Sequence, residues 1–142
     1  MAKQSNFIYC INSERVPGTD GNGDSLNAVG VLSVITPEFV PGAFSFSIIL
    51  SVLDMDVKKE NTIKIVFRDP DGKEIVNTND IVIPPNPNEE TMELPKVYQG
   101  LNMCMDLRNV IFEKEGLYYT EVIVNGNQIG KNEIYVKGRR KN

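Results

Sequence analysis

The side chains of this chain best suited to chemistry lie in one glycine-rich stretch. Asp20-Gly21-Asn22-Gly23-Asp24 places oxygen-bearing side chains at alternate positions, as in the first half of a calcium-binding loop. The second half of that pattern is absent, because Ser25 stands where glycine is needed and Val31 where a bidentate glutamate is needed. We therefore expect no metal site. Calcium binding by Asp20, Asn22 and Asp24 remains the alternative, and it would need Asp54, Asp56, Asp69 and Asp71 at the same end of the fold.

Arginine side chains form the second candidate group. Arg15, Arg108 and the basic tail, residues 137–142, could bind an anionic, nucleotide-like small molecule. The plainer interpretation of the tail is a flexible, solvated terminus. The ligand-binding residues predicted from the sequence are Arg15, Asn22, Asp24, Arg108, Arg139 and Arg140.

Catalytic groups are scarce. The 142 residues include no histidine, which removes the commonest general base and the commonest metal ligand. Cys10 and Cys104 alone cannot complete a four-ligand zinc site. The 19 acidic residues show no spacing that selects a pair for glycoside hydrolysis. We predict a protein that is not an enzyme and that has no cofactor.

Charge and hydropathy exclude two classes of partner. The net charge of −4 and the pI near 4.9 argue against a nucleic-acid binder, which depends on many Lys and Arg contacts. No apolar run approaches the roughly 20 residues that span a membrane. The first residues also lack the features of a secretory signal, so we expect a cytoplasmic protein whose two cysteines are free thiols.

The elements that must position these groups are strands. Leu101, Met103, Met105 and Leu107 alternate with polar residues, which is typical of a strand with one face on a core. Asn125-Gly126 then favours a type I′ hairpin turn. About eight or nine such strands predict an all-β fold, an antiparallel two-sheet β-sandwich, in one domain over residues 1–142. The earlier predicted strands are Phe7–Ile11, Leu26–Ile35, Phe44–Leu53, Thr62–Arg68, Lys73–Thr78 and Ile81–Ile83.

Two long segments are predicted as exposed loops. Asn12–Asn27 is rich in Pro, Gly and Asp, and Pro84–Glu93 follows a strand that its two prolines end. Because sandwiches concentrate function in the loops at their ends, we expect recognition there.

Two resemblances support this fold. Glu115-Gly-Leu-Tyr118 resembles the tyrosine corner of immunoglobulin-like domains, although Thr120 replaces the expected cysteine and the chain has no tryptophan. The overall layout is similar to a family of small bacterial and phage proteins known only as a domain of unknown function. The matching stretches are residues 30–35, 109–118 and 119–130. That resemblance implies a sandwich and supplies no catalytic residues.

We predict a non-enzymatic interaction or ligand-binding module. Its partner would be another protein or a second copy of the chain, giving a homodimer through an unprotected β edge. The alternative is a phage or mobile-element protein that sequesters a small anionic nucleotide-like ligand between protomers. A third candidate is a calcium-dependent adhesion or coat component.

Overall fold

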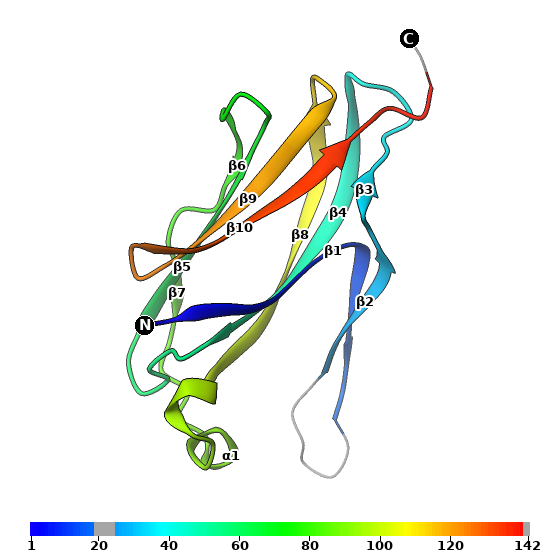
Figure 1. The fold of residues 1–142 in the computed structure, drawn as a ribbon. Helices are drawn as coiled ribbons and strands as arrows, with labels where there is room; N and C mark the ends of the chain where they lie inside the picture. The colour runs from blue at the N-terminus through cyan, green and yellow to red at the C-terminus, as the bar shows by residue number, and fades with distance from the viewer. Residues whose placement is uncertain (19–24, 141–142) are drawn as a thin grey trace.

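Two β-sheets pack face to face in this protein (Figure 1). The computed structural model describes residues 1–18 and 25–140. One short helix, α1 (Glu89–Met92), and one 3-10 turn (Lys96–Tyr98) lie between β7 (Ile81–Ile83) and β8 (Gly100–Phe112). The strands within the described residues are β1 (Lys3–Val16), β2 (Ser25–Val31), β3 (Val34–Ile35), β4 (Gly42–Leu53), β5 (Asn61–Arg68), β6 (Glu74–Asn77), β7 (Ile81–Ile83), β8 (Gly100–Phe112), β9 (Gly116–Val124) and β10 (Asn127–Val136).

The topology is that of an immunoglobulin-like sandwich. The first sheet has the order β2-β1-β4-β8, and the second has the order β3-β10-β9-β5-β6, with β7 also paired to β5. All pairs are antiparallel except β3 with β10. The predicted fold class is therefore confirmed.

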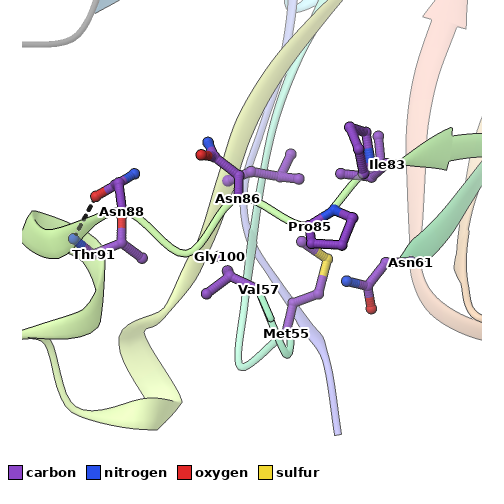
Figure 2. Close-up of a pocket in the computed structure, with 11 residues that line it drawn as sticks. Met55, Val57, Asn61, Ile83, Pro85, Asn86, Asn88, Thr91 and Gly100 are labelled. Atoms are coloured by element: carbon purple, nitrogen blue, oxygen red, sulfur yellow. Dashed lines mark hydrogen bonds between the residues drawn. The ribbon is translucent and has the colours of Figure 1, made fainter. Parts of the chain in front are cut away.

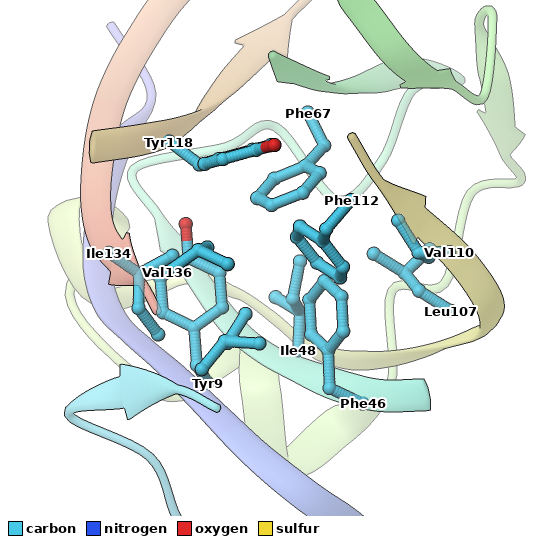
Figure 3. Close-up of a cluster of buried hydrophobic side chains, with 11 residues drawn as sticks. Tyr9, Phe46, Ile48, Phe67, Leu107, Val110, Phe112, Tyr118, Ile134 and Val136 are labelled. Atoms are coloured by element: carbon cyan, nitrogen blue, oxygen red, sulfur yellow. The ribbon is translucent and has the colours of Figure 1, made fainter. Parts of the chain in front are cut away.

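The core lies between the sheets and is rich in aromatic rings. Phe46, Phe67, Phe112 and Tyr118 come from both sheets (Figure 3), and the ring centroids of five pairs among them lie 5.1 to 6.3 Å apart. Along β4 and β5 every second side chain points into this space, and these side chains are apolar. Met103 and Met105 pack against the core from β8, as their register predicts.

The tyrosine corner at Tyr118 and the type I′ turn at Asn125-Gly126 are both present, as the sequence predicts. The Tyr118 hydroxyl donates to the Lys114 carbonyl at 2.8 Å, which makes the tyrosine corner. Asn125 and Gly126 have φ of 49° and 82°, the positive values that a type I′ turn needs. Thr120, in place of the cysteine, shares a 2.5 Å hydrogen bond with the Tyr9 hydroxyl.

Within the segment predicted as a loop over residues 12–27, residues 12–16 and 25–27 lie in paired strands, so the loop prediction was wrong for them. β1 continues to Val16 and pairs with β2, with Arg15 opposite Leu26. The sequence does not show this, because both faces of the ribbon are mostly exposed and its side chains need no alternation. The predicted strand over residues 26–35 is divided into β2, which ends at Val31 just after Gly30 with its φ of 72°, and β3, which begins at Val34.

Candidate functional site

A cavity lies at the end of the sandwich where the chain crosses from β7 to β8. We call it the end cavity (Figure 2), and its volume is about 410 Å³, which is within the range typical of ligand pockets. It is lined by Met55, Val57, Asn61, Ile83, Pro84, Pro85, Asn86, Asn88, Thr91, Gly100 and Leu101.

The wall of the end cavity is formed by the segment after β7. Pro84 and Pro85 lack backbone N–H groups, so the ladder with β5 stops there. The Asn86 N–H then donates to the Val57 carbonyl at 2.9 Å, which holds the segment across the end of the sandwich. Asn88 caps α1, since its Oδ1 accepts from the Thr91 N–H at 2.7 Å. The predicted loop over residues 84–93 is therefore a fixed wall that includes one helical turn.

The floor of the end cavity is formed by the apolar side chains of Met55 and Val57 and by Asn61, whose amide group already has hydrogen-bond partners. Met55 and Val57 are buried, and the Met55 N–H donates to the Gln99 carbonyl at 3.1 Å. The Asn61 amide donates to the carbonyls of Asp56 and Lys59, and its Oδ1 accepts from Asn125. None of the lining side chains is ionisable. The end cavity thus suits an uncharged, largely apolar group.

The end cavity continues into a shallower groove. This second hollow, of about 200 Å³, shares Thr91, Gly100 and Leu101 with the end cavity and extends to Leu53, Leu94, Tyr98 and Asn102. We call the two together the end groove. Leu94, Val97 and Tyr98 are 47%, 48% and 55% exposed beside it. Large apolar side chains gathered at a hollow are typical of a binding surface.

Acidic side chains border the end groove. Glu89, Glu90 and Glu93 are exposed on and next to α1, whereas Lys96 lies in the 3-10 turn and Lys58 and Lys59 lie between the cavity residues Val57 and Asn61. Because Asp54, Asp56 and Glu60 lie in the same segment as Lys58 and Lys59, acidic side chains still outnumber the lysines over residues 54–61 and 89–96.

The structure does not bring the predicted ligand-binding arginines together. Arg15 lies on the β1–β2 ribbon, and Arg108 lies on β8, 3.5 Å from Asp106. Arg139 and Arg140 follow β10, and Arg140 is 3.5 Å from Glu38. The outer part of the ribbon points toward the α1 end, whereas β10 ends at the opposite end (Figure 1). Asp20, Asn22 and Asp24 lie outside the described residues.

A third hollow, of about 460 Å³, lies beside residues 137–140 of the basic tail. It is lined by four cationic side chains, Lys114, Lys137, Arg139 and Arg140, and by Glu113 and Glu115. Three of the cations already have acidic partners: Lys114 contacts Asp71, Lys137 contacts Glu115, and Arg140 contacts Glu38. An anion would have to compete with these carboxylates.

The other carboxylate pairs do not share one end of the fold. Asp54 and Asp56 precede β5, whereas Asp69 and Asp71 follow it. The buried Asp69 accepts from the N–H groups of Asp71 and Lys73 at 2.9 Å each, which is a turn-stabilising role. Over residues 1–18 and 25–140, no three His, Cys, Asp or Glu side chains lie close enough to hold a metal ion.

Comparison with protein families gives a family for the chain. The pattern of a family of unknown function, DUF6941, matches residues 16–137. The chain belongs to the DUF6941 family. The sequence-based resemblance to a small family of unknown function is thereby confirmed, and no curated protein matches this DUF6941 member.

Solved structures similar to this DUF6941 protein are distant in sequence. They include the alkylpurine DNA glycosylase AlkC of Pseudomonas fluorescens (10% identity, TM-score 0.48, 96% of this chain and 30% of that one). An immunoglobulin-like protein of Pseudomonas aeruginosa also matches (10%, 0.42, 94% and 98%). So does the CARDB domain of a Pyrococcus furiosus protein (10%, 0.39, 92% and 90%). In the described part of the DUF6941 chain, no helix is long and apolar enough to cross a membrane.

The sequence predicts recognition at the segment Pro84–Glu93, which forms the wall of the end groove, but it does not predict most of the residues that line the groove. Pro84-Pro85 indicated the segment, whereas Met55, Val57 and Leu101 resembled ordinary core residues. A further signal was available, since Leu94, Val97 and Tyr98 follow an i, i+3, i+4 spacing.

Proposed function

We propose that this DUF6941 protein is a non-enzymatic binding module that takes an apolar segment of a partner protein in the end groove. The observation that carries the proposal is the continuity of the end cavity with the shallower groove through Thr91, Gly100 and Leu101. The absence of histidine from the sequence supports a binding role over catalysis.

The shape and lining of the end groove favour a peptide as the occupant. An elongated hollow accommodates consecutive apolar side chains of an extended segment, with one anchor in the end cavity and others along Leu94 and Tyr98. A compact charged molecule would be desolvated there without a counter-charge, and this costs more than the roughly 2–7 kcal/mol of burying a neutral polar group without a hydrogen bond.

Charge complementarity specifies the flanks of the partner segment. Glu89, Glu90 and Glu93 border the groove, so Lys or Arg residues beside the apolar anchors would be attracted to it. Such rim charges steer association and select partners more than they add affinity.

The test is selection from a displayed random-peptide library, followed by measurement of Kd for the selected peptides. We expect apolar peptides flanked by Lys or Arg. Leu94→Glu should weaken their binding at least about ten-fold, which corresponds to about 1.4 kcal/mol. Val82→Glu is the matched control, because Val82 is 56% exposed on β7 and lies outside both linings. Equal loss in both variants, or selection of acidic peptides, would contradict the proposal.

A second candidate function is sequestration of an anionic, nucleotide-like ligand. The hollow beside the basic tail favours it, since Arg139 and three further cations line about 460 Å³. Isothermal titration with a panel of nucleotides tests it. The candidate requires binding heat that Arg139→Ala reduces and Arg108→Ala leaves unchanged, and heat-free injections across the panel would eliminate it.

A further inference from the structure

The free edge of the first sheet is formed by β8. In the order β2-β1-β4-β8, β4 is the one strand that pairs with β8 among the described residues. In immunoglobulin constant-type sheets, a fourth strand lies beside the strand equivalent to β8. Here β6 and β7, which occupy that part of the sequence, both pair with β5 in the other sheet. The edge of β8 is thus left without its usual neighbour.

The first part of β8 lacks the devices that usually protect an edge. Its pairing with β4 is regular from Gly100 to Leu107, and the register shift occurs beyond that point, near Asn109 with φ of 53°. The segment has no proline, no lysine and no inward charge. Long, regular edges of this kind are templates for another strand.

The inward side chains along this edge are incompletely covered. Leu101, Met103 and Met105 pack against the core and remain partly exposed, whereas Leu107 is buried. A further strand beside β8 would cover the three partly exposed side chains.

We propose that the occupant of this edge is β8 of a second copy of the chain, in an antiparallel register centred on Cys104. In such a pair, opposite residue numbers add to 208, so both members of each pair lie on the same face. The inward pairs are then Leu101 with Leu107 and Met103 with Met105. The outward pairs are Asn102 with Asp106, and Cys104 with Cys104 of the second copy. In this register the apolar side chains lie opposite one another, and the Asp106 carboxylate lies opposite the Asn102 amide, which can donate a hydrogen bond.

Neighbouring symmetric registers are less complementary. A centre on Asp106 would oppose two carboxylates, which destabilises a strand pair. A centre on Met105 would place Leu101 opposite Asn109, where the regular strand has already ended. A centre on Met103 would keep the apolar face by pairing Leu101 with Met105, but it would place Asp106 opposite Gly100, which has no side-chain donor. The register centred on Cys104 is the one of these that also gives Asp106 an amide donor.

Site-directed crosslinking tests that register. Opposite residues in antiparallel strands have Cα atoms about 4.5–5.5 Å apart, which is within the roughly 4.4–6.8 Å of a disulfide. Molecular oxygen with copper-phenanthroline removes two electrons and two protons from two Cys104 thiols, and a disulfide-linked dimer should form. Cys104→Ser should abolish it, because Cys10 is buried.

A mixed pair gives an independent test of the register. In a Cys104→Ser background, Asn102→Cys and Asp106→Cys proteins should crosslink when mixed. Neither should crosslink with itself, since its two cysteines would lie four residues apart along the strands. Crosslinks within each single variant and none in the mixture would overturn the proposal.

Sedimentation equilibrium across a concentration series tests the association itself. Wild type should dimerise, and Cys104→Lys should raise the dimer Kd at least about ten-fold by opposing two ammonium groups. Ile111→Lys is the control, because Ile111 is 52% exposed on β8 beyond the paired segment. Circular dichroism confirms that each variant folds. A wild type that stays monomeric, or a dimer that Cys104→Lys leaves unchanged, would overturn the proposal.

Discussion

Two tyrosine hydroxyls connect the apolar core to the backbone. Tyr118 donates to the Lys114 carbonyl, and Tyr9 donates to the Asn132 carbonyl at 2.8 Å while it also bonds Thr120. The Tyr9 contacts join the two sheets, since β1 belongs to the first sheet and Thr120 and Asn132 belong to the second. Thr120, which stands where the tyrosine-corner pattern of antibody domains has a cysteine, makes a buried hydrogen bond to Tyr9 of the other sheet.

Tyr118→Phe should lower the free energy of unfolding by about 1 kcal/mol, the usual contribution of one hydrogen bond. The ring and its stacking on Phe67 would remain, so the loss isolates the tyrosine corner. Urea denaturation measures it. Tyr135→Phe is the control because Tyr135 is 47% exposed, and an equal change in both variants would contradict this role for Tyr118.

The stability of the protein should fall at alkaline pH. Burial raises the pKa of the Tyr9 phenol, and the hydrogen bond with Thr120 offsets only part of that effect. The folded pKa lies above the unfolded value of about 10, so this contribution is complete below that pH and is lost as pH rises above it.

Tyr9→Phe should therefore reduce the difference in the urea midpoint between neutral and strongly alkaline pH. The variant should still lose some stability at alkaline pH, because burial also raises the pKa of Tyr118. At neutral pH it should be less stable than wild type, since the buried Thr120 hydroxyl loses its partner. An unchanged alkaline loss in Tyr9→Phe would contradict this assignment.

At the scale of elements, the β9–β10 hairpin depends on its turn. Gly126 has a φ of 82°, and no atom lies within 4 Å of the position a Cβ would take. Gly126→Ala should thus cost about 1–2 kcal/mol from backbone conformation alone. Gly126→Asn should recover part of that loss in thermal denaturation, because asparagine tolerates positive φ. Equal losses in the two variants would contradict the conformational explanation.

The sequence predicts the strands and turns that are determined by residues close together along the chain. Alternation gave β4, β5 and β8, and Asn125-Gly126 and Glu115-Gly-Leu-Tyr118 gave a hairpin and a corner. The β1–β2 ribbon was missed because its pairing is held by backbone bonds between largely exposed strands. The sequence predicts the wall of the end groove, because that wall is one continuous segment that begins at Pro84-Pro85. It does not predict the floor at Met55 and Val57, because the floor forms where segments distant in sequence pack together.

At the scale of the whole molecule, the two ends of the sandwich differ in chemistry. The α1 end carries the apolar end groove with its acidic border, and the opposite end carries the basic tail and its ion pairs (Figure 1). The proposed dimer edge along β8 runs between the two ends. The two proposed surfaces meet at Leu101 and Asn102, which line the end groove and also lie in the paired segment of β8.

The most direct test of the binding role is a ¹H–¹⁵N NMR titration of the full chain with a selected apolar peptide flanked by lysines. Amide shifts should concentrate on Met55, Val57, Asn86, Gly100 and Leu101, around the end groove. Glu115 and Gly138, at the opposite end, should not move. Shifts confined to that opposite end, or a spectrum that no such peptide changes, would contradict the account.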